Sequence, residues 1–335
     1  MGDGMSDEGR PFLRAEGLAS GLTTGRLRGP GYRQLFRGVY VPASLSVDAR
    51  VRAQAALLIA PSDSAVSRHT AATLWGGAPP PDWHTHVTTF RPPAAALAAT
   101  RPSANGGRRP RAARPREWGR MDVEQIDARV SSDRSEVVEH RGVRVTAPVR
   151  TFLDLAQDLD LVELVVVGDS LVKAGVVTTD ALRTGAATPG RHRRLARRAA
   201  ALVRAGVDSP PESRTRMLCV LAGLPEPEVN IRFVDAEGRV IRRADLGYRG
   251  AKVSLEYDGR QHAESAEQWA EDIRRREQFD GWGWRMVVVT SAGLNQEPAA
   301  TLARIVEVLR SRGEDVGVRS GEWRRYFGPR HLRTA

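Results

Sequence analysis

The chain has very little cysteine and no long hydrophobic run. Cys219 is the only cysteine among 335 residues, which excludes an intrachain disulfide framework and a cysteine-rich zinc site. Its neighbours in the sequence are apolar, so we expect a buried small side chain and not a nucleophile. No stretch of about 18 or more apolar residues is present, which excludes a conventional membrane-spanning helix from the expected structure.

Lysine is also scarce, whereas arginine is abundant. Lysine and arginine together number 51 against 40 acidic residues, a net charge of +11, yet Lys173 and Lys252 are the only lysines. This excess of positive charge favours polyanionic partners, because contacts with phosphate groups reward it. A preference for arginine over lysine can equally reflect codon composition, so the charge by itself does not identify a partner.

Length and composition predict several globular domains. The chain is longer than one ordinary domain, and 41% hydrophobic residues are enough for a real core. We expect a disordered acidic tail (1–10), a winged helix-turn-helix-like domain (11–77), a middle domain (78–205), a nuclease-like domain (206–313) and a C-terminal tail (314–335). The first ten residues lack the basic flank and apolar run of a secretory signal, so we expect a cytoplasmic protein.

Residues 11–77 have the pattern of a small helical unit with a β-ribbon. Thr23 or Thr24 can cap a short helix that carries Arg26 and Arg28, and residues 34–41 alternate like a strand. Further helices are expected over 51–59 and from Ser67 to the glycine pair at 76–77. His69, in the second of these, is expected on the helix surface or in the core and not as a ligand.

The middle domain contains a loop rich in proline and arginine, over about 91–120, which we expect to be flexible. Its arginines could contact phosphates, although a solvated basic loop is the simpler interpretation. Helices are expected over 162–174 and 179–184. A basic helix over 191–204 has a narrow apolar stripe, so it is either a nucleic-acid-binding face or a solvated helix that links two domains.

After Asp208 helices and strands alternate, which predicts an α/β domain: a mixed sheet flanked by helices, preceded by mostly α-helical domains. We expect a helix that begins at Ser209, strands over 229–234, 240–246, 253–258 and 284–290, and helices over 266–279 and 298–310. The last strand follows a crossover, so it should run parallel to the third.

Three acidic residues are expected to meet on this sheet. Glu256 and Asp258 share one face of the third strand, about 7 Å apart, and Asp245 ends the neighbouring strand. Clustered carboxylates repel one another unless a cation neutralises them, and hard oxygen ligands suit Mg²⁺ or Mn²⁺. Such an ion could polarise a phosphate and activate water. A pair of ordinary surface acids on a strand is the alternative.

Residues downstream favour the functional interpretation. His262 follows the third strand closely enough to act as an acid, a base or a phosphate donor, although a single histidine there is often structural. In the next helix we expect Trp269 and Ile273 to be buried and Arg275 and Arg276 to face outward. Either arginine could hold a phosphate, or both could be ordinary surface charges.

These runs together resemble a known family. ADLGY from Ala244, VSLEYDGRQH from Val253, DIRRREQF from Asp272 and GWRMVVVT from Gly283 are similar to an uncharacterised endonuclease-like family. That family is related to the very-short-patch-repair mismatch endonuclease, in the PD-(D/E)xK superfamily. The resemblance implies that Asp245 and Glu256 bind the metal and that Asp258 stands beside them.

The resemblance also implies that Glu212 is the acidic residue of the first helix. The alternative is structural, because Ser209 and Glu212 have the spacing of a capping box. One position departs from the superfamily pattern: the lysine usual two residues after the glutamate is Asp258 here. Activation of water would then fall to the metal or to His262.

The front of the chain resembles a different group. LTTGRL from Leu22, LFRGVYV from Leu35, VSRHTAATLWG from Val66 and TAPVRTFLDL from Thr146 are similar to AbiEi-type antitoxin proteins, which begin with a winged helix. If this part binds DNA, Arg26 and Arg28 would face the groove and Arg37 the backbone.

The sequence therefore predicts a Mg²⁺-dependent endonuclease, positioned by a winged helix on double-stranded DNA, in phage defence, a toxin–antitoxin pair or repair. No membrane partner is expected, while a toxin partner and self-association are left open. The rival is a non-catalytic, antitoxin-like DNA-binding regulator with a degenerate nuclease fold. An RNA substrate is the third alternative, since phosphate contacts do not distinguish the sugars.

Overall fold

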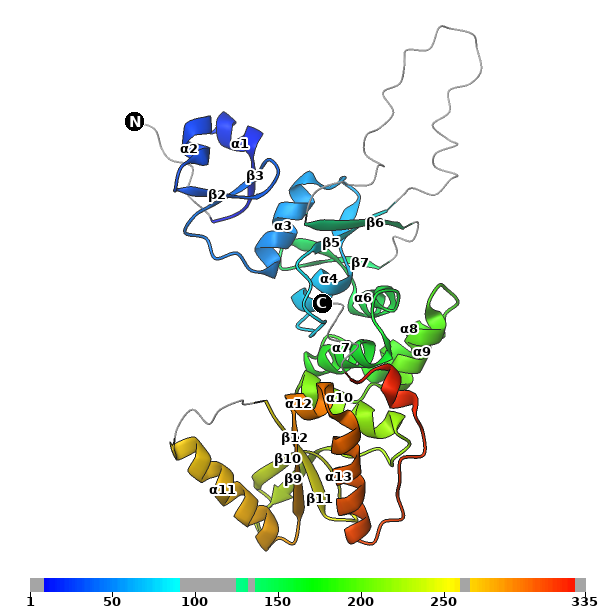
Figure 1. Cartoon of the computed structure of the whole chain (residues 1–335). Helices are drawn as coiled ribbons and strands as arrows, with labels where there is room; N and C mark the ends of the chain where they lie inside the picture. The colour runs from blue at the N-terminus through cyan, green and yellow to red at the C-terminus, as the bar shows by residue number, and fades with distance from the viewer. Residues whose placement is uncertain (1–8, 91–124, 132–135, 260–265, 329–335) are drawn as a thin grey trace. The chain divides into compact units, whose positions relative to one another are not determined.

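The structure is a computed structural model that describes residues 9–90, 125–131, 136–259 and 266–328 (Figure 1). It divides into two compact units: the chain up to Gly76 together with 80–155, and residues 77–79 together with the chain from Ala156. The expected middle domain is thus divided, its first part belonging to the front unit and its last part to the rear unit. The expected flexible loop at 91–120 and most of the expected N-terminal tail lie outside the described residues.

The first unit begins with two short helices and a three-stranded sheet. They are β1 (Phe12–Leu13), α1 (Arg14–Ala19), α2 (Thr24–Arg28), β2 (Tyr32–Phe36) and β3 (Val39–Pro42), with strand order β1-β3-β2. Thr23 caps α2, because its side chain accepts a hydrogen bond from the backbone N–H of Arg26 at 3.2 Å. The single strand expected over 34–41 is wrong. Gly38, at a φ of +82°, reverses the chain there into a hairpin.

A five-stranded mixed sheet completes this unit, in the order β6-β5-β4-β8-β7. Its strands are β4 (Ser64–Val66), β5 (Thr85–Phe90), β6 (Ile126–Ser131), β7 (Val137–His140) and β8 (Val143–Thr146), and its helices are α3 (Ala49–Ile59), α4 (Arg68–Leu74) and α6 (Pro148–Leu155). The expectation of mostly α-helical front domains is therefore wrong up to Thr146, where two sheets form. The central strands bury hydroxyl side chains that bond one another, as Ser64 and Thr89 do at 2.8 Å, so no apolar alternation marks them in the sequence.

The second unit opens with four helices: α7 (Leu161–Lys173), α8 (Thr179–Ala187), α9 (Arg193–Leu202) and α10 (Pro210–Leu221). Asp160, Thr178 and Ser209 cap three of them. The basic helix α9 packs against α7 and α8 and buries Ala196, Ala199 and Ala200. Its apolar stripe is therefore part of the core of this unit, and α9 is not a solvated linker.

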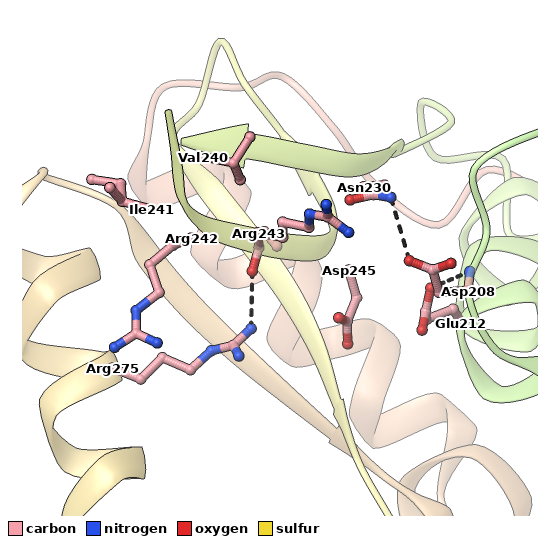
Figure 2. A pocket seen from close by; sticks show the side chains of 10 residues that line it. Asp208, Glu212, Asn230, Val240, Ile241, Arg242, Arg243, Asp245 and Arg275 are labelled. Atoms are coloured by element: carbon pink, nitrogen blue, oxygen red, sulfur yellow. Dashed lines mark hydrogen bonds between the residues drawn. The ribbon is translucent and has the colours of Figure 1, made fainter. Parts of the chain in front are cut away.

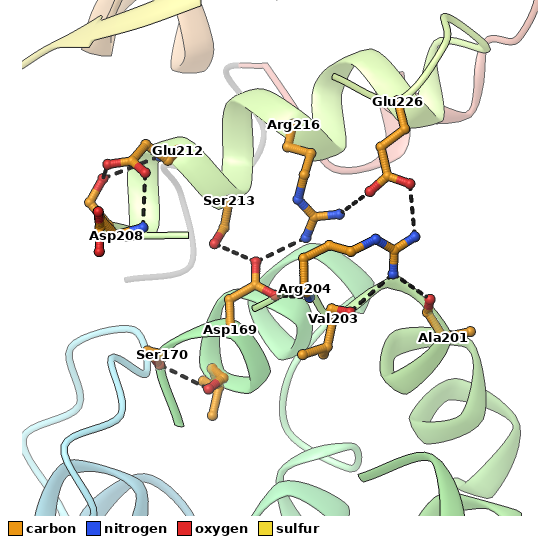
Figure 3. Close-up of polar contacts among 12 residues, drawn as sticks. Asp169, Ser170, Ala201, Val203, Arg204, Asp208, Glu212, Ser213, Arg216 and Glu226 are labelled. Carbon is orange, nitrogen blue, oxygen red and sulfur yellow. Dashed lines mark hydrogen bonds and ion pairs between the residues drawn. The ribbon is translucent and has the colours of Figure 1, made fainter. Parts of the chain in front are cut away.

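A charged network ties α7 to α10 (Figure 3). Asp169 is 2% exposed and accepts hydrogen bonds from the Ser213 hydroxyl at 2.7 Å, the Arg216 guanidinium at 2.9 Å and the Arg204 backbone N–H at 2.8 Å. Arg216 is fully buried and also pairs with Glu226 at 2.8 Å. Each oxygen of the Asp169 carboxylate thus faces at least one donor, as a buried charge requires.

The rest of the second unit is an α/β layer. The strands are β9 (Glu228–Val234), β10 (Val240–Tyr248), β11 (Val253–Asp258) and β12 (Arg285–Thr290), in the order β12-β11-β10-β9, with β11 and β12 parallel. The helices are α11 (Ala266–Gly281), α12 (Ser291–Asn295) and α13 (Pro298–Ser311). In Figure 1 the four strands lie between α11 and α13. The predicted parallel crossover and strand positions are confirmed, because this region follows regular patterns of apolar residues.

Two smaller expectations can be compared with the structure directly. Cys219 is fully buried, as predicted. Residues 314–328 do not form a loose tail: a 3₁₀ turn, η2 (Glu322–Arg325), packs against α10, and Val316, Trp323 and Phe327 are buried. Among the described helices, none has both the length and the apolar character needed to cross a membrane.

Candidate functional site

Adjacent positions of β10 and β11 bring Asp245 and Glu256 together, and Asp245 lies inside β10, which continues to Tyr248, and not at the strand end that the sequence predicted. The two strands pair antiparallel with Leu246 opposite Leu255, which makes Asp245 and Glu256 neighbours across the strands. The Asp245 carboxylate also accepts a hydrogen bond from the backbone N–H of Tyr257 at 3.1 Å. Three of the sequence-predicted acids, Asp245, Glu256 and Asp258, line one cavity of about 210 Å³.

Burial raises the pKa values of two of these acids, Asp245 and Glu256. Glu256 is 8% exposed, and burial together with the nearby Asp245 raises its pKa to about 8, although Arg275 opposes this shift. Burial also raises the pKa of Asp245. The Oε1 atom of Glu256 is buried and has no hydrogen-bond partner within the part of the chain that the structure describes. A buried acid with a raised pKa and a free oxygen is typical of a functional site.

Arg275 supplies positive charge to this cavity. Its guanidinium pairs with the Oε2 atom of Glu256 and donates a hydrogen bond to the backbone carbonyl of Arg243 at 3.0 Å. Arg276 lines the same cavity and is exposed. The structure thus brings both predicted arginines to the acids, with Arg275 in direct contact.

A second cavity, of about 380 Å³, shares Asp245 and Arg275 with the first and adds residues that the sequence analysis did not select (Figure 2). In Figure 2 the Asp245 side chain lies between Arg275 on one side and Asp208 and Glu212 on the other. Asn230, which has a φ of +50°, donates a hydrogen bond to Asp208 at 3.3 Å. A non-glycine residue with positive φ in a strand is a backbone signal that the sequence does not reveal.

Glu212 lies at this second cavity but is used by the helix cap. Its Oε1 atom accepts a hydrogen bond from the Ser209 hydroxyl at 2.8 Å, and its Oε2 atom accepts one from the backbone N–H of Asp208 at 2.9 Å. Burial raises its pKa, and Asp245 contributes to the increase. The capping interpretation therefore describes the contacts of Glu212, although each of its oxygens accepts only one hydrogen bond and keeps a second lone pair.

Some predicted residues cannot be placed or are placed differently. His262 lies outside the described residues, as do the side chains of Trp269 and Asp272. The expected burial of Ile273 is wrong, since Ile273 is 36% exposed. Among the described side chains of α11, Phe279 enters the core, where it joins Ile231, Ala244 and Trp284.

The candidate DNA-contacting arginines of the front unit are exposed. Arg26 and Arg28 lie on α2, and Arg37 lies at the turn between β2 and β3. Among the described residues, no ion pair to any of the three is found at 4.0 Å or less. Their charges are therefore available to an anionic partner.

A group of metal-ligating side chains lies in the first unit, where the sequence analysis expected none. His69, Asp82 and His86 each offer one ligand atom, and these atoms lie within 4.8 Å of one another. Burial lowers the pKa of His86 to about 4, with Arg68 and His69 adding to the effect. Among the described residues no second group of this kind is found, so Asp245, Glu256 and Asp258 do not form one in this structure.

The comparisons with known proteins add no relative. No protein-family model matches the chain, and no curated protein sequence matches it significantly.

Proposed function

We propose that residues 206–313 form a metal-dependent endonuclease domain that hydrolyses phosphodiester bonds of DNA. The observation that supports this most directly is the pair of carboxylates at Asp245 and Glu256. They lie beside each other, with Glu256 buried and Asp245 partly buried, the pKa of Glu256 is raised to about 8, and the cavity that they line also holds two arginines. Burial of like charges against each other is costly, so such an arrangement is rarely kept for stability alone.

The donor set suits Mg²⁺ or Mn²⁺. Carboxylate oxygens are the hard ligands that these ions prefer, and the Oε1 atom of Glu256 is an acceptor without a partner in the described chain. Asp245, Glu256 and Asp258 would hold the ion, after Arg275 releases Glu256 and the carboxylates turn toward one another. When bound, the ion would polarise the phosphate and lower the pKa of water.

The remaining roles fall to residues of this chain. Arg275 and Arg276 would hold a phosphate oxygen at the cavity, where a guanidinium forms strong charge-assisted hydrogen bonds. Arg26, Arg28 and Arg37 would bind the DNA backbone and groove through residues 11–77, which we propose to be a winged helix. Glu212 would stabilise the start of α10 beside Asp245, through the N-terminal cap that it forms with Ser209.

Plasmid nicking tests this proposal. The purified full chain is incubated with supercoiled DNA and Mg²⁺ or Mn²⁺, beside Glu256→Gln, which keeps the shape and removes the charge. Glu277→Gln is the matched control, because Glu277 is an exposed acid on α11. We expect nicking by the wild type and by the control, and a rate of nicking about 1,000-fold lower in Glu256→Gln. A loss of this size corresponds to several kcal/mol of transition-state stabilisation. Equal activity in all three proteins, or none in any, would remove the catalytic proposal.

One observation favours a second function. Arg275 already neutralises Glu256, and the position of the usual lysine is occupied by Asp258. Both features suit a non-catalytic DNA-binding regulator whose nuclease-type fold serves as a platform. Footprinting on promoter DNA without strand cleavage would support this alternative. The same assays with an RNA of matched sequence would show which nucleic acid is bound.

A further inference from the structure

Three segments of the first unit converge on one small polar site, which is separate from the acids of the second unit. His69 lies in the first turn of α4, His86 lies on β5, and Asp82 lies in the segment before β5. The three ligand atoms lie within 4.8 Å of one another. His69 is half-buried and His86 is buried, while Asp82 reaches the surface, so the site is anchored in the core and open to solvent on one side.

The spacing of Asp82 and His86 fits a shared cation better than a direct hydrogen bond. The Nε2 atom of His86 and the Oδ2 atom of Asp82 are 3.4 Å apart. An N–H···O hydrogen bond is usually about 2.7–3.2 Å long. Two ligands at about 2.0–2.1 Å from a tetrahedral zinc ion lie roughly 3.3–3.4 Å from each other. The observed separation therefore matches one edge of a coordination tetrahedron, and the third ligand, His69, would have to move closer, since the three ligand atoms lie up to 4.8 Å apart.

The ligand atoms are held in position by neighbouring groups. The Oδ1 atom of Asp82 bonds the His84 backbone N–H and ring, both at 2.8 Å, which leaves its Oδ2 atom directed toward His86. The Thr70 hydroxyl contacts the Nδ1 atom of His86 at 3.3 Å and accepts a hydrogen bond from its backbone N–H at 2.9 Å. A partner on the second ring nitrogen is what fixes a metal-binding imidazole. The ring of His69 stacks on that of His86 at 4.8 Å.

The charges around the site distinguish a cation from an anion. Arg68, which is 1% exposed, is the nearest buried positive charge, but its guanidinium is paired with the Asp127 carboxylate at 2.7 Å. Arg129 lies 3.8 Å from the same carboxylate. Among the three ligand residues Asp82 is the acidic one, and its negative charge would repel a phosphate. Two imidazoles with one carboxylate are instead the ligand set of zinc-type ions.

We propose that His69, Asp82 and His86 bind one divalent transition-metal ion of the zinc type. Three protein ligands leave a further coordination position for water or a small ligand. The ion would join the start of α4 to β5 and to the segment between them, so its binding would stabilise the first unit. This site lies in the first unit, whereas the proposed nuclease centre lies in the second. The two sites also prefer different metals, because a site made of carboxylates alone selects Mg²⁺ or Mn²⁺.

Cobalt is the probe that tests this site. The full chain is stripped with a chelator, dialysed and titrated with Co²⁺, whose visible absorption reports binding to nitrogen ligands, and Zn²⁺ is then added as competitor. We expect one equivalent of Co²⁺ per chain, displaced by Zn²⁺. His69→Gln and Asp82→Asn should each weaken Co²⁺ binding at least about 10-fold. Asp82→Asn keeps the oxygen that His84 contacts, and circular dichroism checks that the variants remain folded.

Two further variants make the result specific. His192→Gln alters an exposed histidine of the second unit and should leave Co²⁺ binding unchanged. Glu256→Gln should also leave it unchanged, even if that variant loses nicking, which separates this site from the proposed nuclease centre. Absence of stoichiometric Co²⁺ binding, or equal affinity in the wild type, His69→Gln and Asp82→Asn, would overturn the proposal. Loss of Co²⁺ binding in Glu256→Gln would overturn it as well, by assigning the ion to the acids.

Discussion

Two clusters of buried carboxylates lie in the second unit, and they handle negative charge in opposite ways. Asp169 receives three hydrogen bonds, one of them from the fully buried Arg216. Glu256 lies beside another acid, Asp245, and one of its oxygens has no partner within the described residues. Burial raises the pKa of both Asp169 and Glu256, so the pKa shift does not separate the two clusters. Both oxygens of Asp169 face a donor, although the buried Nε atom of Arg216 has no hydrogen-bond partner among the described residues, whereas the unpartnered oxygen of Glu256 leaves a capacity to bind. This difference, more than burial itself, separates a structural charge from a candidate functional one.

The largest expected effect concerns the satisfied cluster. Asp169→Ala would leave the Arg216 charge in the core with Glu226 as its remaining partner, so we expect the free energy of unfolding to fall by about 3–5 kcal/mol. Urea denaturation followed by circular dichroism measures this. Asp180→Ala, which breaks an exposed pair with Arg183, is the control and should cost no more than about 1 kcal/mol. A similar small loss in both variants would show that the buried cluster is not structural.

The acid cluster should instead make stability depend on pH. The pKa of Glu256 is about 8 in the folded chain against an ordinary value of 4.5, so the folded state keeps a proton that the unfolded chain releases. Its stabilising contribution is complete below pH 4.5 and is lost as pH rises through about 8, a change of up to roughly 5 kcal/mol.

Urea denaturation at a series of pH values measures this loss. Glu256→Gln should flatten the curve, because glutamine does not titrate. Mg²⁺ should also flatten the curve of the wild type if it binds the ionised carboxylates, as the proposed function requires. A wild-type curve that rises over the same pH range would contradict the placement of Glu256 beside Asp245.

Arg275 tests whether the acid cluster acts on a phosphate. Arg275→Gln removes the guanidinium that contacts Glu256 and lines both cavities. If it also holds a phosphate in the transition state, we expect plasmid nicking to fall by about 100-fold. Arg274→Gln is the matched control, since Arg274 is an exposed neighbour on the same helix. Faster nicking in Arg275→Gln would show that Arg275 blocks the cation site instead.

The smallest expected effect concerns the cap of α10. Ser209→Ala removes the N-cap side chain and its bond to Glu212, so the free energy of unfolding should fall by about 1 kcal/mol. Nicking by the folded variant should be unchanged. If nicking is lost while stability is kept, Glu212 would belong with the functional acids and not with the satisfied charges.

Regular patterns in the sequence predicted much of the second unit. The strand limits from Glu228 to Thr290, the parallel pairing of β11 with β12 and the cavity shared by Asp245, Glu256 and Asp258 agree with simple periodicity. The five-stranded sheet of the first unit could not be predicted in this way. Its strands are short, its buried positions are often Ser or Thr, and β5 is separated from β6 by 35 residues, from 91 to 125.

The sequence by itself determined where the acids lie along the chain, where the caps begin the helices and which apolar runs form the rear sheet, since these depend on neighbours within a few residues. Only the tertiary structure decided which charges are satisfied. In the sequence Asp169 and Arg216 are 47 positions apart, Arg275 and Glu256 are 19 positions apart, and His69 and His86 are 17 positions apart. Partners so far apart are chosen by the packing of whole elements, because burial, distance and pKa are properties of the folded chain.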